Sequence, residues 1–277
     1  MNHARSPARS INFRAPPAVR GKVQAAIAVA FAAATLALGG CAAMSGGSGK
    51  SWQATDLAVA LASPTRPQAD RDRDADRKPS DSVLFFGVKQ GMTVLDVWAA
   101  GGYFTEVLSV AVGPKGKVYS QNPPMLLKAR DGVYDKAITQ RLADNRLPNV
   151  VRVDGDLPAS AIPADSVDIA VTALNFHDVY NRDAAAGLAF MKNVYAELKP
   201  GGVFVVIDHV GVDGANNAQL HRVPKHVAID AAKQAGFTVD AESPLLAHPA
   251  DDHTKAVFDA SLRGRTDQFM VKLRKPK

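Results

Sequence analysis

This chain of 277 residues has one cysteine, two tryptophans and few aromatic side chains, which make up 6% of its residues. The single cysteine, Cys41, rules out a disulfide bond within the chain. No Gly-x-Ser-x-Gly motif follows a predicted strand, which argues against a serine hydrolase of the α/β type. The sequence also lacks an internal repeat, and no two histidines have the His-x-x-x-His spacing that favours a metal site.

The net positive charge is small once the N-terminus is set aside. The formal net charge is +6, but five of these charges lie between residues 1 and 22, so residues 41–277 carry +1. No later segment combines a basic stripe with interleaved aromatic residues. We therefore expect no nucleic-acid binding, and we attribute the pI of about 9.4 to the N-terminus.

The first 41 residues have the pattern of an export signal. Residues 1–22 are basic and contain no acidic residue, residues 23–38 are mostly apolar, and Leu-Gly-Gly-Cys follows at residues 38–41. This ending resembles the lipobox of bacterial lipoproteins, in which the cysteine becomes the lipidated first residue. We predict a signal peptide over residues 1–40 and a lipid anchor at Cys41 on the periplasmic face of a bacterial membrane. An uncleaved membrane anchor and a wrongly assigned start are the alternatives.

Residues 41–80 are predicted to form a tether and an N-terminal helical extension, ahead of a single domain over residues 81–277. The tether is small and polar, which is typical of a flexible segment. Arginine and aspartate alternate over residues 66–78, and we interpret this charged run as a solvated helix. The alternative is an Arg/Asp cluster placed over the mouth of a site.

From residue 80 onward, helical and strand patterns alternate. Repeated strand–helix units predict an α/β fold with a doubly wound, mainly parallel sheet and helices on both faces. Strands are expected at 93–97, 117–121, 150–154, 167–174, 203–208, 237–241 and 268–273. Helices are expected at 52–61, 80–88, 104–112, 124–147 with interruptions, 183–198 and 224–235.

Residues 93–106, which read TVLDVWAAGGYFTE, are the most informative segment. An apolar strand runs into a turn of small residues at 99–102, and a helix begins directly after it. In α/β proteins this arrangement brings backbone N–H groups close to a nucleotide-like ligand at the helix N-terminus. The segment therefore indicates both the ligand class and the location of a site.

Two further segments resemble class I S-adenosylmethionine-dependent methyltransferases. They are residues 197–208, ELKPGGVFVVID, and residues 162–168, IPADSVD. The resemblance covers about residues 81–275 and implies a Rossmann-like, seven-stranded sheet whose last strand is antiparallel. It also implies S-adenosylmethionine as cofactor and a small-molecule methyl acceptor. Residues 174–180, 250–254 and 266–272 additionally resemble a little-characterised group of predicted exported methyltransferases.

The resemblance assigns roles to residues of the cofactor site. Asp96 would orient the amino-acid part of the cofactor, and a wall against the cofactor would be formed by Ala99, Gly101 and Gly102. Asn122 would hold the ribose, Asp156 would contact the adenine amine, and Asn175 with Phe176 would lie beside the transferable methyl group.

The chain departs from the superfamily pattern at two points. Trp98 and Ala100 occupy the positions of the first two loop glycines. Because tryptophan strongly disfavours a positive φ, we expect that the loop cannot take every glycine conformation. Asn122 replaces the usual carboxylate, and an amide offers the ribose weaker acceptors. A Rossmann-like ligand-binding lipoprotein without catalytic activity is therefore the alternative.

Candidate catalytic residues follow two neighbouring strands. His177 with Asp178 and Asp208 with His209 lie at strand ends, where sites form in open α/β sheets. We predict that His177 or His209 removes the acceptor's proton while Asp178 or Asp208 orients the imidazole.

The other histidines and the late loop complete the sequence-based expectations. Histidines 221, 226, 248 and 253 are interpreted as loop or surface residues. We assign no metal ligands. A metal-dependent enzyme is a third interpretation, with ligands drawn from His177, Asp178, Asp208, His209, Asp252 and His253. The long connection over residues 242–264 is predicted to act as a lid, through residues 250–255, or as a surface flap.

Overall fold

The computed structural model describes residues 49–159 and 161–277. The predicted signal peptide over residues 1–40 and the predicted lipidation site at Cys41 lie outside this range. Within it, no helix combines the length and the apolar character needed to cross a membrane.

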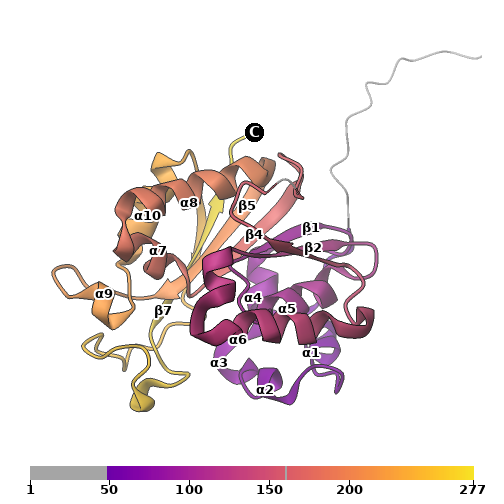
Figure 1. Ribbon diagram of the computed structural model, residues 1–277, viewed down its shortest axis with the longest axis horizontal. Helices are drawn as coiled ribbons and strands as arrows, with labels where there is room; N and C mark the ends of the chain where they lie inside the picture. The colour runs from indigo at the N-terminus through magenta and orange to yellow at the C-terminus, as the bar shows by residue number, and fades with distance from the viewer. Residues whose placement is uncertain (1–48, 160) are drawn as a thin grey trace, which may run out of the picture. The chain divides into compact units, whose positions relative to one another are not determined.

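A seven-stranded sheet with the order β3-β2-β1-β4-β5-β7-β6 forms the centre of the fold (Figure 1). Its strands are β1 (Thr93–Val97), β2 (Lys117–Asn122), β3 (Val150–Asp154), β4 (Val167–Ala173), β5 (Leu198–His209), β6 (Thr238–Ser243) and β7 (Gln268–Arg274). Neighbouring strands from β3 to β5 are parallel, while β7 is antiparallel to both β5 and β6. The predicted Rossmann-like sheet with an antiparallel last strand is thus confirmed.

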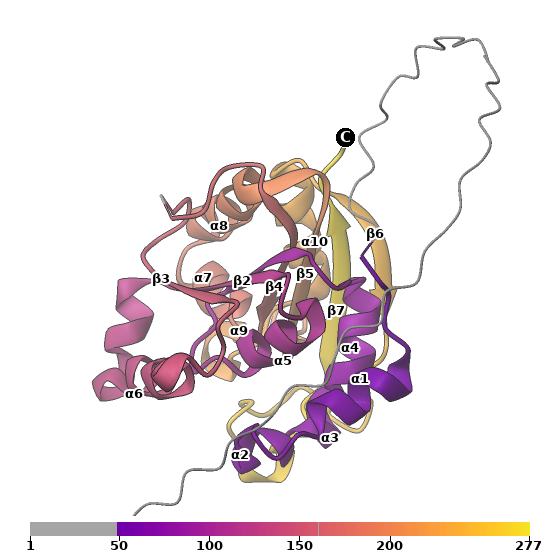
Figure 2. The same ribbon diagram turned by 90° about the vertical axis from the view of Figure 1, so that its right-hand side faces the viewer.

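Helices cover both faces of the sheet (Figures 1 and 2). The N-terminal half contains α1 (Ala54–Leu61), α2 (Gln68–Arg71), α3 (Asp74–Arg77), α4 (Pro79–Phe86), α5 (Tyr103–Val112) and α6 (Pro124–Leu142). The C-terminal half contains α7 (Phe176–Arg182), α8 (Ala184–Glu197), α9 (Asn217–Leu220) and α10 (Lys225–Gln234). Because successive strand residues point to opposite faces, the chain builds two hydrophobic cores, one on each side.

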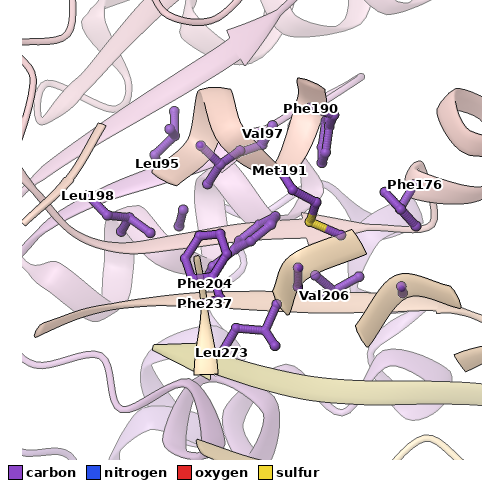
Figure 3. Packing of buried hydrophobic residues seen from close by; sticks show 14 of the residues in the cluster. Leu95, Val97, Phe176, Phe190, Met191, Leu198, Phe204, Val206, Phe237 and Leu273 are labelled. Atoms are coloured by element: carbon purple, nitrogen blue, oxygen red, sulfur yellow. The ribbon is translucent and has the colours of Figure 1, made fainter. Parts of the chain in front are cut away.

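One core joins α7, α8 and α10 to the sheet (Figure 3). Alternate residues of the inner strands point into it, among them Leu95 and Val97 of β1 and Phe204 of β5. The Phe204 ring packs against Phe237 at a centroid distance of 5.8 Å. Burial of each such side chain stabilises the fold by about 1.5–3 kcal/mol, so this layer fixes the strand ends that carry the site.

The other core includes helices that precede residue 80. Leu57 and Leu61 of α1 are buried with residues of α4 and α5, and the Trp52 indole N–H donates to the Ala111 carbonyl at 2.7 Å. Residues 52–80 therefore pack into the same compact unit as the sheet.

Three elements differ from the sequence-based expectation. The helix α7 lies where a loop was expected. The strand β5 starts at Leu198 and therefore includes the Lys-Pro-Gly-Gly turn, and its pairing with β4 has a register shift there. The charged run over residues 66–78 forms two short helices, α2 and α3, instead of one. The predicted interruption of α6 is present, since residues 129–132 have non-helical dihedral angles.

Candidate functional site

The turn after β1 keeps the glycine-like conformation without the expected glycines. Trp98 has φ of 55° and Ala100 has φ of 50°, and Gly102 follows with φ of 81°. The expectation that Trp98 would prevent this conformation is therefore wrong. A left-handed conformation costs a non-glycine residue about 1–2 kcal/mol, so the surrounding structure must hold the turn in place.

Three amide side chains hold this turn. Gln121 accepts the Trp98 N–H at 3.2 Å, and Asn175 donates to the Trp98 carbonyl at 3.1 Å. Asn122 accepts the Ala100 N–H at 2.7 Å and donates to the Ala100 carbonyl at 3.1 Å. Asn122 is fully buried, so both ends of the amide that was assigned to the ribose are committed to the turn.

Gly102 brings α6 close to the turn. A Cβ atom there would lie 2.7 Å from Ile138 Cδ1 and 2.9 Å from Arg141 Cδ, both on α6. Arg141 also donates from Nε to the Gly101 carbonyl at 2.7 Å. A glycine is thus favoured at position 102 by the close packing of α6 and by the positive φ. A larger side chain at this position would clash with Ile138 and Arg141 of α6.

A first cavity of about 320 Å³ lies over the carboxyl end of β1. Four of the residues assigned to the cofactor site line it: Asp96, Ala99, Gly101 and Asn175. Gly102, Asn122 and Asp156 do not line it, and Asp156 is exposed in the loop after β3.

The charged run of the N-terminal helices forms part of this first cavity. Asp70 of α2, Arg73 directly before α3 and Arg77 of α3 line it, and Asp70 is only 5% exposed. The interpretation of this run as a solvated helix holds only for its outer side, where Asp72, Arg73 and Asp76 are exposed, because the other side of α2 and α3 packs against the site. The alternative, a cluster over the mouth of the site, describes the structure.

A buried ion network fixes one wall of the first cavity. Glu106 of α5 is 2% exposed and pairs with Arg141 and Arg146. Burial raises the pKa of Glu106, but the two guanidinium groups outweigh it and hold the pKa below its usual value. Arg141 Nη2 also lies 2.7 Å from Asp70 Oδ2, outside hydrogen-bonding geometry.

Asp96 provides a carboxyl group whose charge depends on the contents of the first cavity. Burial raises its pKa to about 7, although a hydrogen bond from Thr105 Oγ1 at 2.6 Å favours the ionised form. A cation placed in the cavity would shift Asp96 toward the carboxylate.

A second cavity of about 540 Å³ adjoins the first through Arg73 and Arg77, which line both. Its remaining lining residues are Asp76, Leu174, His209, Val257, Phe258, Arg263, Gly264, Thr266 and Gln268. The late loop therefore contributes residues 257–266 to the cavity wall. The segment assigned to a lid, residues 250–255, instead anchors the loop, because Asp251 forms a fully buried ion pair with Arg222.

The two candidate bases have opposite environments. His177 Nδ1 lies 2.6 Å from Asp208 Oδ1, and Asp178 lies 3.3 Å from His177 Nε2. Burial disfavours the charge on His177, but the two carboxylates outweigh it and raise the pKa to about 10. His177 therefore holds its proton at neutral pH, and it does not line the second cavity.

His209, in contrast, is neutral and faces the second cavity. Burial lowers the pKa of its imidazole to about 4, although Asp208 opposes this shift. The His209 Nδ1 atom is buried without a hydrogen-bond partner in the described part of the chain. Of the two histidines, only His209 is neutral and lines a cavity.

One residue close to the site was not assigned to it from the sequence. His221, expected at the surface, lies 3.0 Å from Asp178 through Nδ1 and packs against the His177 ring. His221 follows α9, far from α7 in the sequence, so only the tertiary fold brings them together. Among the described residues, three side chains lie close enough to share a metal ion: His177, Asp178 and His221. The ligand set considered from the sequence, which also included Asp208, His209, Asp252 and His253, does not come together in this way.

Comparisons with known proteins support a relationship to methyltransferases. No family model matches the chain. It is 26% identical over 183 residues to the ubiquinone/menaquinone biosynthesis C-methyltransferase UbiE of Idiomarina loihiensis, covering 63% of this chain and 67% of that protein. It is 32% identical over 124 residues to UbiE of Shewanella sp. strain W3-18-1, covering 44% of each. The chain thus spans less than half the length of the Shewanella relative.

Solved structures share the fold. A SAM dependent methyltransferase from Aquifex aeolicus has a TM-score of 0.54 and 19% identity, over 81% of this chain and 99% of that one. The [4+2]-cyclase SpnF has a TM-score of 0.54 and 17% identity, over 73% and 81%. At these identities the likeness shows the fold alone. The chain has the α/β, Rossmann-like methyltransferase fold, and its reaction must be argued from the site.

Proposed function

We propose that this chain is an S-adenosylmethionine-dependent methyltransferase that acts on a small-molecule acceptor. The observation that carries the proposal is the first cavity, which lies over the carboxyl end of β1 and is lined by the turn at residues 98–101 and by Asp96. Its position in the sheet matches the place where open α/β folds bind their ligands. The UbiE relatives, which are C-methyltransferases, support the same reaction class.

The charges in the first cavity suit this cofactor. S-adenosylmethionine carries a sulfonium and an ammonium cation together with one carboxylate. Asp70 and Asp96 present carboxyl groups to the cavity, and Asp70 is also paired with Arg141 at 2.7 Å. Arg73 and Arg77 supply cationic partners for a carboxylate. When bound, the cofactor supplies a methyl group activated by the sulfonium.

The second cavity is proposed to bind the acceptor. Its wall combines apolar side chains, Val257 and Phe258, with guanidinium groups. Arg77 forms no ion pair with a carboxylate in the described part of the chain, and it stacks over the Tyr103 ring at 4.6 Å. A partly apolar acceptor with an acidic group, such as a hydroxylated aromatic carboxylic acid, matches this lining.

His209 is the proposed base within the second cavity. Its neutral imidazole keeps a lone pair at physiological pH and accepts the proton of the acceptor's nucleophilic atom. Asp208 Oδ1 accepts the His209 backbone N–H at 2.7 Å, which holds the residue in place. Most of the rate acceleration would come from aligning acceptor and methyl group, and the base would add to it.

We predict that cofactor affinity rises with pH between about pH 6 and 8. The pKa of Asp96 is about 7 in the free protein, so below that pH the group is largely protonated and a bound cation must displace the proton. As the pH rises toward 7, the dissociation constant should fall by up to about tenfold per pH unit. Above pH 7 it should level off. Calorimetry in buffers of different ionisation enthalpy would detect the released proton.

Asp96→Asn supplies the critical comparison. This variant should bind the cofactor more weakly and show no proton release, while the exposed control Asp56→Asn should behave like the wild type. A wild-type affinity that does not change with pH would show that Asp96 does not face the cofactor's cations.

We further propose that the mature protein begins at Cys41 and is anchored to a membrane by lipid at that residue. The basis is the Leu-Gly-Gly-Cys ending of the apolar N-terminal segment. Mass spectrometry of membrane fractions should detect an N-terminal peptide that starts at lipid-modified Cys41. A Cys41→Ser variant should accumulate as unprocessed chain. Recovery of a soluble wild-type chain that retains residues 1–40 would contradict the proposal.

A further inference from the structure

Two histidines and one aspartate from separate elements form a compact cluster beside the second cavity. His177 and Asp178 lie in the first turn of α7, and His221 directly follows α9. Asp178 Oδ1 lies 3.0 Å from His221 Nδ1 and 3.3 Å from His177 Nε2. The three atoms all lie within 4.8 Å of one another.

The two distances from Asp178 Oδ1 match those between ligands of one metal ion. Nitrogen and carboxylate ligands bind Zn²⁺ at about 2.0–2.2 Å, which places neighbouring ligand atoms roughly 3.0–3.5 Å apart in tetrahedral or octahedral geometry. Two imidazoles and one carboxylate also form a donor set that suits divalent transition metals.

Asp208 orients the His177 imidazole for such a role. Its Oδ1 atom lies 2.6 Å from His177 Nδ1, which leaves Nε2 directed toward Asp178. Asp208 is fully buried and accepts the backbone N–H groups of His177 at 2.8 Å and His209 at 2.7 Å, so its carboxylate is rigidly held. Metal-binding histidines are commonly oriented in this way, by a carboxylate on the other ring nitrogen.

The cluster is open on one side. The side chain of His177 is 4% exposed, but those of His221 and Asp178 are 36% and 51% exposed. The His221 ring packs at 4.7 Å from Phe258, which lines the second cavity. Three protein ligands with an open side leave room for water or for an exchangeable ligand, as in catalytic metal sites.

We propose that His177, Asp178 and His221 bind a divalent transition-metal ion of the Zn²⁺ type at the edge of the second cavity. Asp208 acts as the positioning residue for His177, and the ion takes the place of the proton that His177 Nε2 carries in the metal-free chain. The ion would leave at least one coordination position for water or for an anionic group of a molecule bound in that cavity. This inference does not depend on cofactor binding or on methyl transfer.

The test is metal binding by the full chain, purified without a polyhistidine tag and stripped with a chelator. Equilibrium dialysis should give one tightly bound Zn²⁺ per chain, and Co²⁺ should produce the visible absorption of a site with imidazole ligands. His221→Ala and Asp178→Asn should abolish tight binding, and Asp208→Asn should weaken it by about 10–100-fold. Zn²⁺ should raise the Tm of the wild type but not of the two ligand variants.

A matched control is available on α10, where His226 Nε2 lies 3.5 Å from the exposed Asp213. His226→Ala should bind Zn²⁺ like the wild type. Because His221 and Asp178 are partly exposed, their variants should fold, and their Tm without metal checks this. The proposal is overturned if the wild type binds Zn²⁺ no more tightly than His221→Ala. It is also overturned if the double variant that carries both His221→Ala and Asp178→Asn keeps its metal. If the wild type binds Zn²⁺ no more tightly than His221→Ala, Asp178 merely forms ion pairs with the two histidines.

Discussion

Replacing His209 with glutamine should lower kcat by about 10²–10⁴-fold, the usual contribution of a general base. His209 lines the second cavity with a neutral imidazole, so it can reach an acceptor bound there. Glutamine keeps a polar side chain of similar length but cannot take up a proton. The rate is measured as release of S-adenosylhomocysteine with hydroxylated aromatic carboxylic acids as acceptors.

The same variant should keep its cofactor affinity within about twofold, because His209 does not line the first cavity. The exposed His226→Gln is the control and should retain full turnover. His177→Gln should differ from both, since it removes a buried imidazolium that pairs with Asp208 and should chiefly reduce stability. Undiminished kcat in His209→Gln would remove His209 from the chemistry and leave positioning as the source of the rate.

Replacing Arg222 with leucine should destabilise the fold by about 3–5 kcal/mol, the usual cost of removing one partner from a buried ion pair. Arg222 and Asp251 are both fully buried and contact each other at 2.9 and 3.1 Å. Arg222 also donates to the Val210 carbonyl at 3.1 Å. Without it, Asp251 is a buried carboxylate that keeps only backbone N–H donors, from His253 and Asp267.

The loss should appear as a Tm lower by roughly 6–20 °C and as a lower urea midpoint. Because this pair anchors the loop that supplies Val257 and Phe258 to the second cavity, KM for the acceptor should also rise. Lys225→Leu breaks an exposed ion pair with Glu242 and should cost less than about 1 kcal/mol. Equal losses in the two variants would contradict the assigned role of the Arg222–Asp251 pair.

The sheet could be predicted from the sequence because buried parallel strands have a simple pattern. Val94, Leu95 and Val97 form an apolar run because β1 is covered on both faces, and the same applies to β4 and β5. The helix α7 was not predicted, because its seven residues span only two turns. Its apolar residues Phe176, Val179 and Tyr180 have helical spacing, but the segment is too short to establish a period.

The charged side chains of the site were harder to predict. An Arg/Asp run has the same composition whether it is solvated or packed over a cavity, and only the docking of α2 and α3 decides between the two. The turn at Trp98 and Ala100 depends likewise on distant partners, since the amides of Gln121, Asn122 and Asn175 hold it. His221 meets Asp178 only through the tertiary fold.

Calorimetric titration of the purified chain tests whether the first cavity binds S-adenosylmethionine. We expect saturable binding of one S-adenosylmethionine per chain, competition by S-adenosylhomocysteine, and a clear loss of affinity in Asp96→Asn but not in Asp56→Asn. The absence of heat and of competition at millimolar ligand, with a folded wild-type chain, would contradict this expectation. The fold would then serve a ligand-binding function without methyl transfer.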